Sequence, residues 1–168
     1  GSRTLDKAEA AVADLREVMA ERGVAAVNVR AMENLAAAAT ADIVTLTVPF
    51  SHQTATLELV KPVLQGKILI DVTVPLVPPK VARVQLPAQG SAGQIAQELL
   101  GDEVDVVSAF QNVAAAHLQE GRGLECDVLI SGNKKSARYE VLKLVEAAGM
   151  RRLHAGMINN AAAAEALT

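Results

Sequence analysis

Two short apolar segments rich in β-branched residues constrain the fold of this chain most strongly. Residues 42–49 and 67–72 are predominantly apolar, which is typical of parallel strands that are buried on both faces. Between them, residues 51–64 have the composition of a helix, with Ser51 as the predicted N-cap. A strand, a helix and a strand within about thirty residues form a βαβ unit, so the sequence predicts an α/β protein with a parallel sheet.

The rest of the chain continues this alternation. Apolar residues recur at helical spacing over 6–21, where Thr4 and Asp6 are candidate N-caps and Gly23 follows the helix end. Further helices are expected at 34–39, 91–100 and 134–148, with the first turns of another at 159–167, and further strands at 24–29, 105–110, 126–131 and 150–155. Four prolines predict an irregular loop over 74–87 that crosses the top of the sheet, and 111–123 is expected to be a loop or a helical turn.

Composition limits the class of protein. The 168 residues suffice for one domain, and an apolar content of 51% is too high for a disordered chain. A net charge of −3 argues against binding to nucleic acid. No apolar run approaches the ~18 residues that span a bilayer. We therefore expect a single domain over residues 1–168 that binds neither nucleic acid nor a membrane.

The single cysteine, Cys126, excludes an internal disulfide and a multi-cysteine metal site. Such sparing use of cysteine fits the reducing cytoplasm, where we expect the protein to reside. Cys126 itself lies in an apolar segment and is expected to be an inert core thiol. The chain has no nucleophile elbow and no Walker A sequence, and its three histidines lack metal-ligand spacing.

The first candidate site is Gly1-Ser2-Arg3, directly before the first predicted helix. An arginine fork, a small hydroxyl and the free N–H groups of a helix start together suit a phosphate group. In dinucleotide-binding folds, an arginine at the end of the second strand accommodates the 2′-phosphate of NADP. Two alternatives stay open: an arginine near a terminus is commonly only solvated, and Gly-Ser is also a common remnant of tag removal.

The second candidate site is Val48-Pro49-Phe50-Ser51-His52, which follows the clearest strand. Ligands of open α/β sheets bind outside the carboxyl ends of the strands, and the helix that follows directs its positive end there. His52 can donate a hydrogen bond to phosphate or ribose oxygens. The alternative is that His52 only caps a helix in solvent.

The third candidate site, residues 109–117, follows the strand expected at 105–110. The amides of Gln111 and Asn112, and the small residues after them, would let a flat ring approach the backbone. The alternative is an ordinary strand-to-helix connection in which small residues serve packing.

In their order along the chain, these stretches resemble one protein family. The resemblance is carried by Gly1-Ser2-Arg3 with Lys7, residues 46–52, 71–76, 107–114 and 126–132, Ala155-Gly156, and residues 160–168. Each motif is weak by itself, but their ordered combination covers essentially the whole chain. The combination is similar to the NADPH-dependent coenzyme F420 reductases, also called F420H2:NADP oxidoreductases.

The resemblance implies a Rossmann-like, doubly wound domain that transfers a hydride reversibly between NADP(H) and the 5-deazaflavin coenzyme F420. It implies a cytoplasmic homodimer whose ligands are small-molecule cofactors. By the same resemblance, the 2′-phosphate of NADP is held by Ser2, Arg3 and Lys7. The NADP path is lined by Val48, Pro49 and His52, with Val74 nearby, and nicotinamide and deazaflavin stack beside Asn112, Val113, Ala114 and Ala115.

Such a reaction needs few side chains. Hydride passes directly between carbons when two rings lie face to face at roughly 3–3.5 Å, and the cofactors carry the reactivity. No residue is therefore expected to act as a catalytic acid or base, and the small Ala114, Ala115 and Ala116 suit two stacked rings. The family usually has histidine where this chain has Gln111, which can donate a hydrogen bond but cannot carry a charge.

The family opens with a strand and a Gly-rich phosphate loop, which have no counterpart in this sequence. We therefore expect the sequence to be part of a longer chain, and by itself to be poorly soluble and to bind NADPH weakly. Two other functions stay open. One is a non-catalytic Rossmann-like module that binds a nucleotide or a partner subunit, and the other is an NADP-dependent reductase with another acceptor, such as a flavin or ferric ion.

Overall fold

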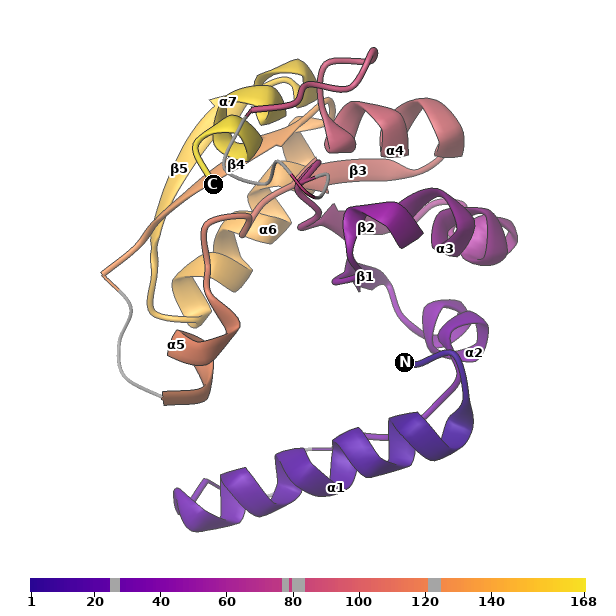
Figure 1. Cartoon of the computed structure of the whole chain (residues 1–168), viewed down its shortest axis with the longest axis vertical. Coiled ribbons are helices and arrows are strands. Elements are labelled where there is room, and N and C mark those ends of the chain that lie inside the picture. Colours follow the sequence, from indigo (N-terminus) through magenta and orange to yellow (C-terminus); the bar gives the residue numbers. More distant parts are fainter. Residues whose placement is uncertain (25–27, 77–78, 80–83, 121–124) are drawn as a thin grey trace. The chain divides into compact units, whose positions relative to one another are not determined.

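A computed structural model of the chain describes residues 1–24, 28–76, 79, 84–120 and 125–168 (Figure 1). These residues form two compact units, Gly1–Asp42 and Ile43–Thr168. Each unit is built from elements that the sequence predicts within a few residues. The expectation of one domain over residues 1–168 stays a prediction.

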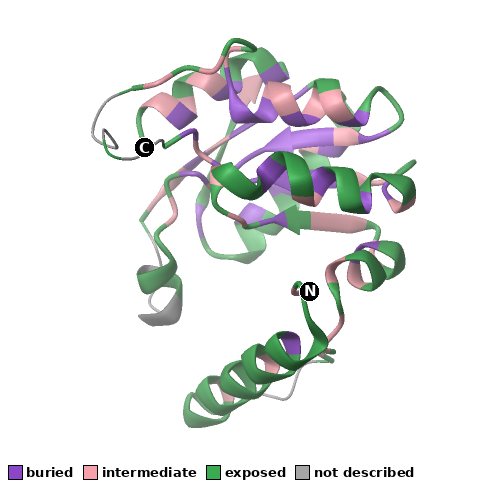
Figure 2. Ribbon diagram, turned by 45° about the vertical axis from the view of Figure 1, so that its right-hand side comes forward, coloured by how far each residue is buried: buried purple, intermediate pink, exposed green. Residues whose placement is uncertain are grey.

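The first unit contains two helices, α1 (Leu5–Glu21) and α2 (Asn34–Thr40). Thr4 is the N-cap residue of α1, but its side chain accepts no hydrogen bond from the helix, and Asp6 lies inside the first turn. Within this unit only Ala8 of the predicted apolar face is buried, so α1 is largely exposed (Figure 2). The helical spacing therefore predicted the element correctly, but not the burial of its apolar face.

A single parallel bridge ties the start of the first unit to the residue before α2. It pairs Ser2 with Glu33: Ser2 N–H donates to Met32 O at 3.2 Å, and Asn34 N–H donates to Ser2 O at 2.8 Å. The strand expected at 24–29 falls partly on residues 25–27, which lie outside the described residues. Residues 24, 28 and 29 are not in a strand.

The second unit is built around a five-stranded sheet in the order β1-β2-β3-β4-β5. Its strands are β1 (Ile43–Leu46), β2 (Ile68–Asp71), β3 (Asp105–Ser108), β4 (Asp127–Gly132) and β5 (Arg151–Gly156). The first three are mutually parallel, β4 is antiparallel to β3, and β5 is parallel to β4. The predicted mainly parallel, Rossmann-like α/β sheet is confirmed.

The helices of this unit alternate with its strands (Figure 1). They are α3 (Gln53–Val60), α4 (Ala92–Leu100), α5 (Ala115–Glu120), α6 (Lys135–Ala147) and α7 (Ala161–Ala166), with 3-10 turns η1 (Phe50–His52), η2 (Lys61–Val63) and η3 (Ile158–Asn160). The prediction that Ser51 is an N-cap was wrong. Pro49 begins the turn η1, His52 N–H donates to Pro49 O at 2.8 Å, and His52 takes the N-cap position of α3.

Alternate residues of the central strands face opposite layers of helices. Ile70 and Val107, which are paired in register, belong to one core cluster with Val141 and Val145 of α6. Ser108, one residue on, faces the other layer, because a Cβ added at Gly93 of α4 would lie 3.2 Å from its Cβ. The sheet is thus covered on both faces, as a doubly wound fold requires.

The two strands expected to be buried on both faces differ. Leu69 and Ile70 of β2 are fully buried, as expected. In contrast, β1 lies at the edge of the described sheet, and its Thr45 is exposed. Of the loop predicted over 74–87, residues 77–78 and 80–83 lie outside the described residues, and the others have no regular structure.

Candidate functional site

The carboxyl ends of β1, β2 and β3 meet at one edge of the sheet. Leu46, Asp71 and Ser108 are paired in register as the last residues of these parallel strands. The residues that follow them leave the sheet at the same edge, and these include Val48, Pro49, His52, Val74, Asn112, Val113, Ala114 and Ala115. The structure therefore brings together eight of the eleven predicted site residues, while Ser2, Arg3 and Lys7 belong to the first unit.

After β1, the turn at Pro49 presents His52 to solvent. Val48 is half-buried, whereas Pro49 and His52 are exposed. The His52 carbonyl accepts from Thr56 Oγ1 at 2.7 Å, which ties it to α3, but its ring has no partner among the described residues. The imidazole is thus available to a ligand at this edge.

After β2, a buried carboxylate holds the chain in place. Asp71 is fully buried, and its two oxygens accept from Thr73 N–H at 2.9 Å and from Gln53 Nε2 at 2.6 Å. Gln53 Nε2 also lies 2.9 Å from Ala92 O of α4. The network thus fixes the turn that leads to Val74. Burial raises the pKa of Asp71 above its ordinary value of 3.8, against the lowering effect of these hydrogen bonds.

A second buried carboxylate lies at the start of α4. Glu165 of α7 accepts from Ala92 N–H at 2.7 Å and from Gly93 N–H at 3.1 Å, so it satisfies two free donors of that helix. Burial raises the pKa of Glu165, with a further contribution from the charge of Asp71. In the sequence, the one sign of this network is Asp71, an acidic residue inside the apolar segment 67–72, and this position alone predicts no function.

After β3, the chain turns sharply at Phe110, which has a positive φ of 69°. Gln111 is almost fully buried, and its Nε2 donates to Ser108 Oγ at 2.6 Å and to Asp71 O at 3.0 Å. Asn112 Nδ2 donates to Asp127 O at 2.8 Å and lies 3.2 Å from Cys126 Sγ. Cys126 was expected in a buried core strand, but it lies directly before β4 and is half-buried.

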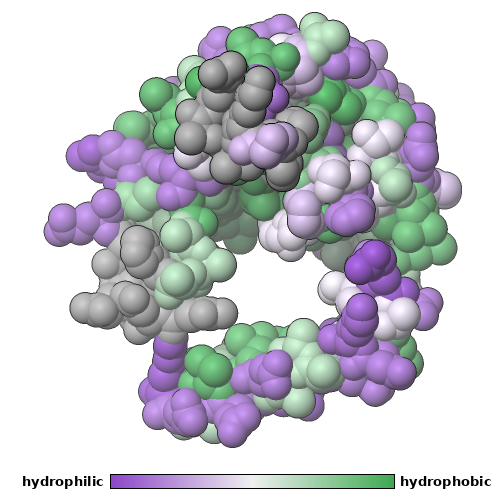
Figure 3. Space-filling model, viewed as in Figure 1, coloured by the Kyte–Doolittle hydropathy of each residue, from purple (hydrophilic) through white to green (hydrophobic). Residues whose placement is uncertain are grey.

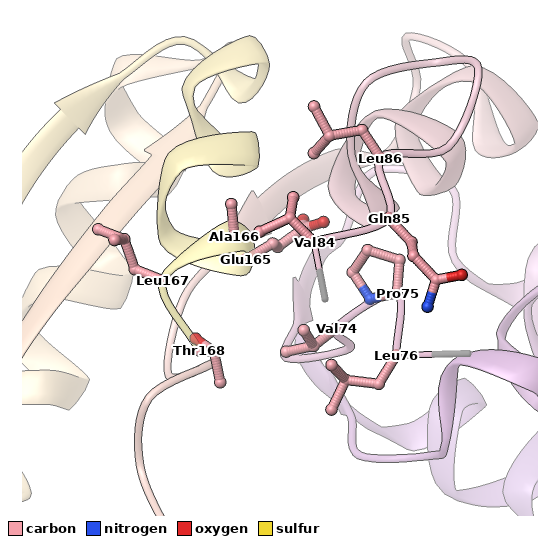
Figure 4. A pocket seen from close by; sticks show the side chains of 10 residues that line it. All are labelled: Val74, Pro75, Leu76, Val84, Gln85, Leu86, Glu165, Ala166, Leu167 and Thr168. Carbon is pink, nitrogen blue, oxygen red and sulfur yellow. The ribbon is translucent and has the colours of Figure 1, made fainter. Parts of the chain in front are cut away.

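Two hollows adjoin this edge. One, of about 470 Å³, is apolar and is lined by residues of β1, β2, α5 and α6 and by Phe110, Val113 and Ala115. The other, of about 150 Å³, is lined by residues 74–76, 84–86 and 165–168, with Val74 on one side and Leu167 on the other (Figure 4). Val113, Ala115 and Val74 therefore line concave surfaces.

In the first unit, Ser2, Arg3 and Lys7 gather at the start of α1. Arg3 and Lys7 are exposed, and neither has a hydrogen-bond or ion-pair partner in the part of the chain that the structure describes. The first N–H groups of α1 receive no side-chain cap. Unpaired cations beside uncapped N–H groups form a suitable environment for a phosphate.

Two other kinds of site find no support in the described residues. No group of three or more His, Cys, Asp or Glu side chains there could hold a metal ion. Among the same residues, no helix is long and apolar enough to cross a lipid bilayer.

Comparisons with known proteins agree with the geometry. Residues 1–75 match the family model described as NADP oxidoreductase, coenzyme F420-dependent. The F420-dependent NADP reductase of Methanocaldococcus jannaschii is 35% identical over 173 residues, which cover all of this chain and 77% of that protein. The enzyme of the same name from Methanothermobacter marburgensis is 36% identical and is covered to 76%.

A solved structure from Arthrobacter sp. FB24, assigned to the F420-dependent NADP reductases, superposes with a TM-score of 0.68 at 28% identity. The superposition covers 80% of this chain and 63% of that one, so this chain spans less than two thirds of the solved protein. With identity above 30% along the whole sequence to two enzymes of one name, the chain belongs to the F420-dependent NADP reductase family.

Proposed function

We propose that this chain transfers a hydride reversibly between NADP(H) and the deazaflavin coenzyme F420. The observation that carries this function is the match of the entire chain, at 35% identity, to an F420-dependent NADP reductase. The described geometry supports it, because the predicted ring-binding and NADP-lining residues of the second unit leave the sheet at one edge. In open α/β sheets this edge is where ligands bind.

The residues of the first unit fit the phosphate of NADP. Ser2, Arg3 and Lys7 would hold the 2′-phosphate, since two cations and a hydroxyl are free beside uncapped helix N–H groups. In the second unit Val48, Pro49 and Val74 would line the NADP path, and the free imidazole of His52 would donate to a phosphate or ribose oxygen. NADP then supplies the nicotinamide that gives or takes the hydride.

The ring-facing segment is Asn112–Ala115. Its alanines are exposed and carry no polar side chain, so a flat ring can approach the backbone there. These residues orient rings and exclude water, and the chemistry needs no proton transfer from a side chain. The buried Asp71 at this edge is engaged by Gln53 and Thr73.

Mixing the full-length protein with NADPH and oxidised F420 tests the activity directly. We expect the visible absorbance of the deazaflavin to fall as NADPH is consumed in a one-to-one ratio, and to return when excess NADP and reduced F420 are supplied. FMN and ferric citrate, offered as acceptors in place of F420, serve as controls. Turnover with either of them at the F420 rate, or none with F420, would contradict the proposed acceptor.

We further propose that the protein acts as a homodimer in the cytoplasm. Large apolar side chains reach the surface of the second unit (Figure 3), and Val84, Leu86 and Leu167 are 59%, 57% and 84% exposed. Such side chains are commonly covered by a partner subunit. Sedimentation equilibrium at micromolar concentration measures the state, and a monomer mass would contradict the dimer.

A further inference from the structure

The turn after β3 adopts a backbone conformation that its sequence does not favour. Phe110 is the one non-glycine residue with a positive φ in the described part of the chain. In this conformation the Cβ of an L-residue crowds its own backbone, so the surroundings must hold it in place. Val113 N–H donates to Phe110 O at 3.1 Å, which closes the turn but does not attach it to the sheet.

Gln111 attaches the turn to the strands on one side. Its Nε2 donates to the backbone carbonyl of Asp71, the last residue of β2, and to Ser108 Oγ at the end of β3. Ser108 is 1% exposed and Gln111 is 9% exposed, so these bonds are shielded from water. An amide nitrogen has two protons, and both are used here, so none is left for a ligand.

Asn112 attaches the turn to the strand on the other side. Its Nδ2 donates to Asp127 O at 2.8 Å, at the start of β4. In the sheet β3 lies between β2 and β4, so two consecutive amides bind the two neighbours of the strand that they follow. The amide bracket, meaning Gln111 and Asn112 with these acceptors, thus fixes the direction in which the chain enters residues 113–115.

We propose that Gln111 is a positioning residue that sets the place of the ring-facing segment, and that it does not contact the deazaflavin. The inference rests on the proposed function and adds to it the means by which the segment is held. Because hydride transfer is sensitive to small displacements of the reacting atoms, a loosened bracket lowers kcat even when both cofactors still bind.

Removal of either partner in the bracket tests the proposal in the full chain. Gln111→Ala and Ser108→Ala are each expected to lower kcat, by about 10- to 100-fold and by a smaller factor respectively. The KM values for NADPH and F420 should stay within about twofold of the wild type. The double variant should be no slower than Gln111→Ala alone, since Gln111→Ala already removes the bond to Ser108 Oγ that Ser108→Ala removes.

Gln97→Ala is the matched control. Gln97 Nε2 donates to Gly101 O at 2.8 Å and to Val104 O at 3.0 Å, so it holds the connection before β3 as Gln111 holds the turn after it. The control loses these two bonds, and the longer one in which Gln97 Oε1 accepts from Val106 N–H at 3.4 Å, all away from the turn after β3, and is expected to keep the wild-type kcat. A merely structural role of Gln111 would make Gln97→Ala and Gln111→Ala alike in kcat and melting temperature, and would overturn the proposal.

Three further outcomes separate the possible failures. If Gln111→Ala raises the KM for F420 while Ser108→Ala is silent, Gln111 binds the deazaflavin and the proposal is wrong. If Gln111→Ala does not fold, Ser108→Ala tests the proposal instead. A wild-type kcat in Ser108→Ala then contradicts the positioning role of Gln111. Absence of turnover in the wild-type protein contradicts the proposed function and this inference together, whereas wild-type turnover with unaffected variants contradicts only the inference.

Discussion

Arg3 is exposed, lies two residues before α1 and has no ion-pair partner among the described residues. In the full-length protein, Arg3→Ala is expected to weaken the binding of NADPH by roughly 10-fold or more at low salt and to leave NADH nearly unchanged, because only NADPH carries the 2′-phosphate. Titration calorimetry with both cofactors measures the difference. Arg22→Ala, at the other end of the same helix, is the control. Equal losses for NADPH and NADH would refute a 2′-phosphate role.

Ala115, the first residue of α5, lines the apolar hollow together with Phe110 and Val113. Ala115→Leu should reduce kcat severely, because the added side chain displaces the rings. It should preserve the fold, because the hollow has room for the larger side chain. Steady-state kinetics and a melting curve measure the two effects. Ala148→Leu adds the same side chain to the same hollow from the end of α6. Because Ala148 lies outside the ring-facing segment Asn112–Ala115, this variant should leave kcat near normal. A normal kcat in Ala115→Leu would place the ring site elsewhere.

At the scale of elements, the antiparallel pairing of β3 and β4 depends on Gly132. A Cβ at this position would lie 2.8 Å from Val106 O, closer than real Cβ atoms come to a backbone oxygen. Gly132→Ala is therefore expected to destabilise the fold by about 1–3 kcal/mol, since the two strands must separate. Urea unfolding measures the change.

Gly149→Ala is the comparison for this variant. A Cβ there meets nothing within 4 Å, so the substitution costs only its positive φ of 76°, about 1 kcal/mol. If Gly132→Ala is as stable as Gly149→Ala, the close approach of β4 to β3 does not require glycine at position 132, and the prediction is wrong.

At the scale of the whole second unit, two buried acids connect β2, α3, α4 and α7. The pKa values of Asp71 and Glu165 are both raised, chiefly by burial, from ordinary values of 3.8 and 4.5. An acid with a raised pKa binds its proton more tightly in the folded state than in the unfolded state. The contribution of these two acids to the free energy of unfolding is therefore highest below pH 3.8, and it falls as the pH rises toward their pKa values in the folded state.

Asp71→Asn should flatten this acid-side pH dependence. The variant cannot ionise, and a rotated Gln53 amide can offer its oxygen, which has no partner among the described residues, to the new Nδ2. Urea unfolding between pH 4 and pH 8 measures the slope. Asp127→Asn is the control of opposite sign, because Arg151 lowers the pKa of Asp127, so that its contribution is lost as the pH falls. A slope unchanged in Asp71→Asn would contradict the prediction.

Much of the element order was predictable from the sequence, for local reasons. The apolar runs at 42–49 and 67–72 contain β1 and β2, and the helical spacing at 91–100 and 134–148 matches α4 and α6 within a residue. Parallel strands imply that their carboxyl ends share an edge, so the gathering of His52, Val74 and Asn112 there was also predictable. These features follow from periodicity and from the direction of neighbouring strands.

Long-range contacts decided what remained. The antiparallel pairing of β3 with β4 and the hydrogen bonds of Gln53 and Gln111 to Asp71 join residues 18 to 40 positions apart, on which local pattern is silent. The positive φ of Phe110 is likewise imposed by its neighbours, since its own side chain disfavours it. The sequence by itself thus determined most of the strands and helices and the edge of the sheet at which the predicted site residues gather. Only the tertiary structure decided which polar groups hold that edge in place, because a buried hydrogen bond depends on where the folded chain brings its two partners.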